Sequence, residues 1–251
     1  MLKRIGIFTI TLTLPVWICA ISASTARASM IAHWSADGHA DDDVAGRNGT
    51  LLNGAGYDAG LFGQAFRLDG TDDYVAVPDD DVWTFDGDFT LATWVNFAAI
   101  RTGSMGSLPN VFLAHDQGPY GVPKWVFAYD GRSSLFFHIN GNGSVFLPAP
   151  DPFNPTVGEW HHVALTRSAD TYTFYADGAS KGSVEDARSL PNANAPLTFG
   201  TAENLGYLNG RLDDLRIYDT ALSENEIAAL YPEPSSILML TLACLGLFRR
   251  R

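Results

Sequence analysis

The stretch Phe62-Gly-Gln-Ala-Phe-Arg-Leu-Asp-Gly-Thr-Asp-Asp-Tyr-Val-Ala-Val-Pro78 decides the fold of this chain. Apolar side chains alternate with polar ones on both sides of the pair Asp69-Gly70, and Pro78 ends the second run. Alternation with a period of two is typical of a strand with one buried face, and an Asp-Gly pair favours a tight turn. The stretch therefore predicts two strands joined by a turn.

The same pattern recurs through the middle of the chain. Further strands are expected over residues 89–97, 124–129, 135–139, 160–167, 172–176, 197–199 and 212–218. The expected turn pairs are Asp86-Gly87, Asp130-Gly131, Asn140-Gly141, Asp177-Gly178 and Asn209-Gly210. Strands of this length and spacing predict an all-β sandwich of two antiparallel sheets.

One short helix is expected at the end of this region. Ser223 stands three residues before Glu226, which is the spacing of a capping box, and Ile227 and Leu230 supply an apolar face. The sequence between residues 29 and 230 contains no internal repeat and no low-complexity linker. We therefore expect a single domain over residues 29–230.

Several segments together resemble the laminin-G-like, concanavalin A-like jelly-roll family. They are residues 62–78, Phe89-Thr-Leu-Ala-Thr-Trp-Val95, Gly158-Glu-Trp-His-His-Val-Ala-Leu165 and Gly210-Arg-Leu-Asp-Asp-Leu-Arg-Ile-Tyr218. His33-Trp-Ser-Ala-Asp-Gly38 and Ala221-Leu-Ser-Glu-Asn-Glu-Ile227 fit as well. The resemblance covers nearly all of residues 30–230 and implies a jelly roll. It also implies that His161 and His162 are structural.

The first 28 residues have the pattern of a secretory signal peptide. Lys3 and Arg4 precede an apolar stretch over residues 5–21, and Ala26-Arg27-Ala28 supplies the small residues that a signal peptidase accepts. We expect cleavage before Ser29.

The last 21 residues, 231–251, resemble the PEP-CTERM sorting signal of Gram-negative bacteria. Pro232-Glu233-Pro234 precedes an apolar run over residues 237–248, and the chain ends in Arg249, Arg250 and Arg251. The resemblance implies processing by an exosortase during export to the cell surface or extracellular matrix, with a transient inner-membrane anchor. Twelve residues make a helix of about 18 Å, shorter than a hydrocarbon core of about 30 Å, so a C-terminal helix packed on a soluble domain is the alternative.

Charge and cysteine content limit the partners of the central domain. The whole chain has a formal net charge of −12, and the domain is more acidic still, because Lys3, Arg4, Arg27 and the terminal arginines lie outside it. Such a domain repels nucleic acid and attracts divalent cations. The two cysteines, Cys19 and Cys244, lie in the ends, so the domain has no disulfide.

The family resemblance implies a calcium ion. Its members commonly use an acid in the loop after the first strand and an acid near the last strand, which correspond here to Asp37, Asp43 and Asp213, with Asp214 as a substitute. Oxygen-rich loops of this kind suit Ca²⁺. Which of Asp41, Asp42 and Asp43 faces the ion stays open, and Asp72 and Asp73 fit ordinary turn roles equally well.

Glycan binding is the second expectation. Sugars stack on exposed aromatic rings, while amides and carboxylates bond their hydroxyl groups. The candidate residues are Tyr120, Trp125, Asn140, Asn142 and Tyr207. For Trp125, which Val126 and Phe127 follow, a place in the core is the alternative.

No familiar catalytic motif accompanies these residues. The chain has no strand with alternating acids, no Gly-x-Ser-x-Gly elbow and no His-Glu-x-x-His pair. We therefore expect an exported, non-enzymatic, calcium-supported domain that binds glycan or a surface protein through loops at one rim. The alternatives are a structural component of an exopolysaccharide matrix and a glycoside hydrolase or lyase of the same fold.

Overall fold

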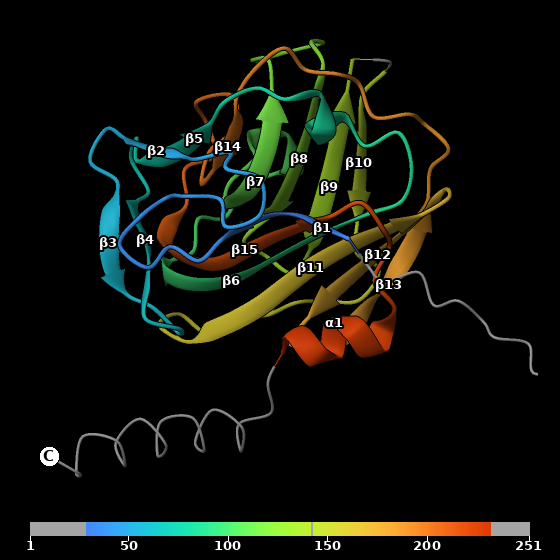
Figure 1. Cartoon of the computed structure of the whole chain (residues 1–251). Helices are drawn as coiled ribbons and strands as arrows, with labels where there is room; N and C mark the ends of the chain where they lie inside the picture. Colours follow the sequence, from blue (N-terminus) through green and yellow to red (C-terminus); the bar gives the residue numbers. More distant parts are fainter. Residues whose placement is uncertain (1–28, 142, 232–251) are drawn as a thin grey trace, which may run out of the picture.

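Two antiparallel sheets stack face to face in a computed structural model that describes residues 29–141 and 143–231 (Figure 1). The larger sheet, called sheet A here, has eight strands, and sheet B has seven. The only α-helix of the described residues is short. This confirms the predicted all-β sandwich.

Sheet A contains the strands around Asp213, the first of the two candidate sites described below. In spatial order they are β13 (Ala179–Glu185), β12 (Thr171–Ala176), β11 (Trp160–Ser168), β6 (Phe89–Ala99), β15 (Asn209–Tyr218), β4 (Gln64–Asp69) and β3 (Gly56–Ala59), and β1 (Met30–Trp34) also pairs with β15.

Sheet B covers the other side of the core. Its order is β10 (Val145–Pro148), β9 (Leu135–Asn140), β8 (Lys124–Tyr129), β7 (Val111–Asp116), β14 (Leu197–Phe199), β5 (Tyr74–Val77) and β2 (Thr50–Leu52). Two short 3-10 helices, Asp81–Thr84 and Met105–Ser107, lie in the connections. The stretch 62–78 forms β4 and β5, which lie in different sheets, so its turn carries the chain across the sandwich instead of closing a hairpin.

Strand β15 has two partners in succession along one side. Its first half pairs with β4, from Asn209 opposite Asp69 to Leu212 opposite Phe66. Its second half pairs with β1, where Leu215 lies opposite Trp34. Asp213 and Asp214 therefore lie where β4 stops and β1 has not begun, and we call this place the β1/β4 gap.

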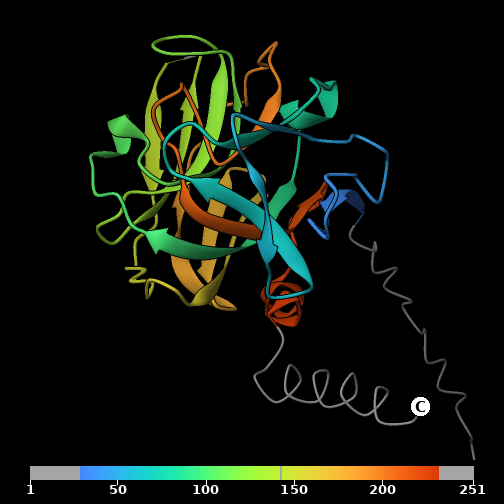
Figure 2. The same cartoon turned by 90° about the vertical axis from the view of Figure 1, so that its left-hand side faces the viewer.

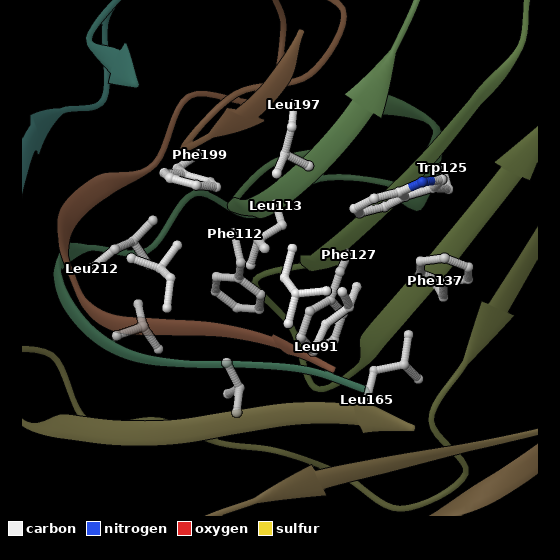
Figure 3. Packing of buried hydrophobic residues seen from close by; sticks show 14 of the residues in the cluster. Leu91, Phe112, Leu113, Trp125, Phe127, Phe137, Leu165, Leu197, Phe199 and Leu212 are labelled. Carbon is white, nitrogen blue, oxygen red and sulfur yellow. The ribbon is translucent and has the colours of Figure 1, made fainter. Parts of the chain in front are cut away.

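The core consists of side chains that point inward from both sheets. Figure 3 shows Leu91 and Leu165 of sheet A facing Phe127 and Phe137 of sheet B, all of them in one buried cluster. Aromatic rings dominate this layer, and the side chain of Trp125 stacks on that of Phe137 with 6.0 Å between ring centroids. Dense aromatic burial of this kind supplies the stability that a domain without disulfides needs.

Helix α1 (Glu224–Leu230) lies against the outer face of sheet A, and Figure 2 shows it end-on below the sandwich. The predicted capping box is present: the Ser223 side chain accepts from the N–H of Glu226, and the Glu226 side chain accepts from the N–H of Ser223. Ile227 is fully buried against Tyr218 and its neighbours. The ring of Tyr231 then stacks on Trp94 of β6 at 5.3 Å.

The two predicted transport segments, residues 1–28 and the tail after Tyr231, lie outside the described residues. Within residues 29–141 and 143–231, no helix is long and apolar enough to cross a membrane.

Candidate functional site

A buried carboxylate with one unused oxygen lies in the β1/β4 gap. Asp213 is fully buried, and its Oδ2 accepts hydrogen bonds from the backbone N–H of Leu61 at 2.8 Å and of Phe62 at 3.0 Å. Its Oδ1 is buried without a hydrogen-bond partner. Burial and, to a smaller extent, the charges of Asp214 and Asp37 raise the pKa of Asp213 to about 7, although the two backbone hydrogen bonds lower it. A nearby cation would relieve all of these costs.

Asp37 lies on the other side of the same β3–β4 turn. Its Oδ1 accepts from the N–H of Gln64 at 2.7 Å, at the first residue of β4. Two glycines of the turn make this approach possible, because a Cβ on Gly63 would lie 2.0 Å from Asp37 Oδ1, and a Cβ on Gly60 would lie 2.7 Å from Asp213 Oδ2. The structure therefore places Asp37 and Asp213, two of the ligands that the resemblance implies, at the same turn.

The other two predicted ligands, Asp43 and Asp214, are engaged by cationic or potentially cationic side chains. Asp214 Oδ1 lies 2.7 Å from His33 Nε2 and also accepts from Arg216 at 3.0 Å. Burial works in the opposite direction, but these hydrogen bonds and the charge of Arg216 lower the pKa of Asp214. Asp43 Oδ2 lies 3.5 Å from His33 Nδ1. The predicted set of four is therefore divided, and only Asp213 presents a buried unused oxygen.

Asp42, one of the three consecutive acids at residues 41–43, has a structural role in the β1–β2 loop. Asp42 is buried and accepts hydrogen bonds from four backbone N–H groups, those of His33, Val44, Ala45 and Arg47. These bonds use both carboxylate oxygens to hold the β1–β2 loop in shape. Asp41 is exposed beside His39.

A second acidic group occupies the turn between β4 and β5. Carboxylate oxygens of Asp69, Asp72 and Asp73 lie within 4.8 Å of one another. Asp69 Oδ1 accepts from the N–H of Thr71 at 2.7 Å, and Asp73 Oδ2 accepts from the N–H of Asp69 at 3.1 Å. Asp69 and Asp73 thus stabilise the turn through backbone hydrogen bonds.

A groove of about 380 Å³ lies on the outer face of sheet B, and its size suits a short oligosaccharide. Its floor comes from β2, β5 and β14, and its walls come from the segments that follow β7 and flank β14. The lining residues are Leu52, Tyr74, Ala76, Asp116, Gln117, Gly118, Ala195, Pro196, Thr198, Thr201, Ala202, Glu203 and Asn204.

The groove wall contains polar groups fixed by a buried lysine. Lys124 is fully buried, and its Nζ donates hydrogen bonds to Gly118 O and Glu203 Oε1 and lies 3.4 Å from Asp116 Oδ1. Asp116 Oδ2 accepts from the N–H of Glu203 at 2.6 Å. Thr201 is only 4% exposed, and its Oγ1 has no hydrogen-bond partner. A buried hydroxyl without a partner costs stability, and Thr201 is also one of the residues that line the groove.

The backbone of this wall is strained at two consecutive positions. Glu203 and Asn204 both have a φ of 55°, in the left-handed region that side chains other than glycine rarely adopt. Such conformations are concentrated at ligand-binding sites, where the surrounding contacts hold them. Here the contacts of Asp116 and Lys124 with Glu203 do so.

The residues predicted to bind glycan differ in their exposure and in their distance from the groove. Tyr120, on the β7–β8 loop, is 86% exposed, and its carbonyl accepts from Nδ2 of Asn140, the last residue of β9, at 2.9 Å. The same loop contains the groove residues Gln117 and Gly118. Tyr207 is half-buried, with its hydroxyl 3.5 Å from Asn204 of the groove. Asn142 lies outside the described residues.

The prediction for Trp125 as a ligand-binding residue is wrong. Its side chain is fully buried, its Nε1 donates to Trp83 O at 2.7 Å, and its ring packs against Phe85 and Phe137. A ring with no exposed face cannot stack on a sugar, so the core alternative holds.

Sequence reasoning missed the groove residues themselves. Tyr74 was detectable, because alternation with the core residues Val75 and Val77 places its side chain on the opposite, outer face. Thr201 and Glu203 gave no sequence signal, because they belong to an irregular loop. The position of this loop depends on Lys124, which lies 79 residues before Glu203 in the chain.

The paired histidines lie in structural contacts. His162 is buried beside Trp94, and burial lowers its pKa to about 4, so it is uncharged at neutral pH. His161 Nδ1 lies 2.9 Å from Asp177 Oδ2.

Comparison with known families places the chain in a class. Residues 69–228 match the model of the concanavalin A-like lectin/glucanases superfamily. This range covers more than half of the chain, which therefore belongs to this superfamily, as the sequence resemblance indicated. No curated protein sequence matches the chain significantly.

Solved structures show the same fold. Domain 4 of AbnA, a GH43 extracellular arabinanase from Geobacillus stearothermophilus solved with arabinotriose, has a TM-score of 0.67 and 20% identity, over 82% of this chain and 99% of that domain. The binding domain of Paraclostridial Mosquitocidal Protein 1 has a TM-score of 0.58 and 17% identity, over 80% of this chain and 51% of its own. A botulinum neurotoxin type C structure, described with two ganglioside molecules in cell entry, has a TM-score of 0.57 and 15% identity, over 83% and 51%. The chain thus spans about half of each toxin chain.

Proposed function

We propose that this chain is an exported, non-catalytic domain that binds glycan in the groove of sheet B. The observation that carries the proposal is a groove large enough for a short oligosaccharide, whose lining residues include Thr201 with its buried, unpartnered hydroxyl. Tyr74 supplies an aromatic ring and Asn204 an amide within the same groove. The similarity to an arabinanase domain solved with arabinotriose supports a sugar as the ligand class.

We also propose a calcium ion in the β1/β4 gap, held by Asp37 and Asp213. The residues fit the ion, because Asp213 Oδ1 is a buried carboxylate oxygen without a partner and Asp37 lies across the same turn. When bound, the ion would stabilise the loops that join β1 to β2 and β3 to β4. Asp43 and Asp214 would not bind the ion directly. They would stabilise the surroundings of the site through their contacts with His33 and Arg216.

Export and sorting complete the proposal. A signal peptidase would remove residues 1–28, and an exosortase would process the tail that begins with Pro232-Glu233-Pro234 and ends with Arg249 to Arg251. The domain would then act at the surface or in the extracellular matrix of a Gram-negative bacterium. Mass spectrometry of secreted and cell-bound fractions would check both cleavages, and an intact chain in the cytosol would contradict them.

The variant Thr201→Val tests the groove. The substitution removes the unpartnered hydroxyl while keeping the side-chain volume, so the free energy of unfolding of the free protein should be unchanged or higher. Glycan affinity should nevertheless fall about five- to tenfold, because the bound sugar loses one hydrogen bond. Thr156→Val, at an exposed position remote from the groove, is the matched control.

A glycan array with each variant, followed by calorimetry on the best ligand, provides the measurement. Unchanged affinity in Thr201→Val would place the binding site elsewhere. Absence of saturable binding by the wild-type chain would favour the structural matrix component. Release of reducing sugar from a bound glycan would favour a hydrolase.

A further inference from the structure

The charge of the groove wall restricts which glycans fit. Asp116 and Glu203 both line the groove, with side chains only 6% and 12% exposed. The nearest cation, Lys124, lies behind them and is fully buried. Among the described residues that line the groove, none is lysine, arginine or histidine. Two carboxylates and one hidden ammonium leave a net negative wall.

We propose that the groove selects neutral glycans and rejects uronate-containing ones, with Glu203 as the acceptor for sugar hydroxyls and Lys124 as its positioning residue. This proposal rests on the glycan-binding function proposed above. A carboxylated sugar would bring a third negative charge close to Asp116 and Glu203 in a partly desolvated site, where like charges repel more strongly than in water. Recognition of carboxylate by proteins instead uses guanidinium groups, which this wall lacks.

The hydrogen bonds already made in the wall indicate which oxygen receives the sugar. Asp116 uses both carboxylate oxygens, accepting from the N–H of Gly118 and from the N–H of Glu203. Glu203 Oε1 accepts from Lys124, and Oε2 has no hydrogen bond among the described residues. A hydroxyl group of a neutral sugar can donate to Oε2, whereas a uronate carboxylate cannot.

The two recognition groups are held in place before a ligand arrives. Glu203 and Thr201 lie two residues apart in one loop, and that loop keeps consecutive left-handed residues at positions 203 and 204. Lys124 fixes the loop from below through Glu203 Oε1. A wall that is already ordered loses little conformational entropy on binding. The two recognition groups therefore keep fixed positions, and an acidic sugar meets the same carboxylates as a neutral one.

The test compares neutral oligosaccharides with uronate oligomers of equal length and linkage, titrated into the full chain at one calcium concentration. The wild-type chain should bind the uronate form at least tenfold more weakly. Glu203→Gln keeps the shape of the side chain and removes its charge, so the ratio of the two affinities should fall at least threefold. Glu185→Gln, an exposed acid on β13 of sheet A, makes the same change in net charge and should leave the ratio unchanged.

Melting curves of each variant confirm that the protein remains folded, because Glu203→Gln weakens a contact of the buried Lys124. Should that variant unfold, Asp116→Asn replaces it with the same expected change of ratio. Uronate binding equal to or tighter than neutral binding would overturn the proposal while the groove itself stands, provided that Thr201→Val weakens that binding. Equal ratios in the wild-type chain and Glu203→Gln would also overturn it. Binding of neither glycan would reject both the proposal and the glycan-binding function.

Discussion

At the scale of single residues, Asp213 and Thr201 have the same property, an oxygen buried without a partner. Burying such an atom costs stability, and folded proteins tolerate it where a bound group supplies the missing contact. Asp213 lies in the β1/β4 gap, and Thr201 lines the groove of sheet B. The two atoms lie at the two places where we propose a ligand, a calcium ion at the first and a glycan at the second.

For Asp213 the consequence is a calcium-dependent melting temperature. In wild-type protein we expect the midpoint to rise by about 5 to 10 °C at calcium concentrations about 100-fold above Kd, relative to chelator. Asp213→Asn should abolish this shift. Asp72→Asn, in the separate acidic turn, should keep it, and loss of the shift there would place the ion at Asp69, Asp72 and Asp73 instead.

The pH dependence in chelator has a defined sign. The pKa of Asp213 is raised to about 7 in the folded protein, so its protonated form is favoured by folding. The contribution of this group to stability is therefore complete below about pH 4 and is lost as the pH rises through 7. Asp213→Asn should lack this loss, so the difference in midpoint between the variant and the chelated wild type should grow from pH 5 to pH 8.

The family resemblance predicted residues of this candidate site. The Asp37 and Asp213 pair followed from the family resemblance, and the structure brings these two residues together. The contacts of Asp43 and Asp214 with His33 were not predictable, because they depend on the pairing of β1 with β15 across the whole chain. Burial of Trp125 was the alternative that the sequence offered, because the apolar residues Val126 and Phe127 follow it, and the structure confirms that alternative.

At the scale of elements, β15 determines the arrangement of sheet A. The pair Asn209-Gly210 was predicted as a turn, but it forms the start of this strand. Gly210 is needed there because the backbones of β15 and β6 approach closely: a Cβ would lie 2.2 Å from Asn96 O. An Asn-Gly pair is a turn signal only where the chain reverses, and here it continues.

Gly210→Ala should therefore destabilise the domain by about 2 to 3 kcal/mol, because the added methyl group forces β15 away from β6. Urea unfolding followed by tryptophan fluorescence measures the change. Gly87→Ala is the control, since nothing lies within 4 Å of its added Cβ, and it should change stability by less than about 0.5 kcal/mol. Equal effects of the two substitutions would show that β15 tolerates the methyl group.

Strands with clear alternation were predicted, and others were missed for physical reasons. Strand β7 is apolar on both faces because loops cover its outer side, so it lacks a period of two. Strand β13 lies at the edge of sheet A and is largely exposed, so it lacks an apolar face. Strands β2 and β3 are only three and four residues long. The capping box of α1, a purely local signal, was predicted correctly.

At the scale of the whole molecule, charge is the dominant property. A formal net charge of −12 with few basic residues means that the folded surface repels itself at low ionic strength. The same charge opposes nucleic acid and acidic polysaccharides at long range, which agrees with a neutral ligand.

Salt should accordingly stabilise the free protein. In chelator, raising NaCl from about 10 to about 200 mM shortens the screening length to below about 10 Å and weakens the repulsion, so the melting midpoint should rise by a few degrees. Differential scanning calorimetry at several salt concentrations measures this shift. A falling midpoint would mean that the ion pairs of Asp214 and Lys124 outweigh the general repulsion.

The place of β15 in the chain also sets the order of events when the protein is made. This strand holds the middle of sheet A, yet it is the last strand to leave the ribosome among those described. Strand β15 pairs with β4 on one side and with β6 on the other. Until residue 218 has emerged, these edges of β4 and β6 are therefore unpaired in the nascent chain. Folding is thus deferred almost to the end of synthesis, which would suit the export proposed above, because an exported polypeptide crosses the membrane before it adopts its final shape.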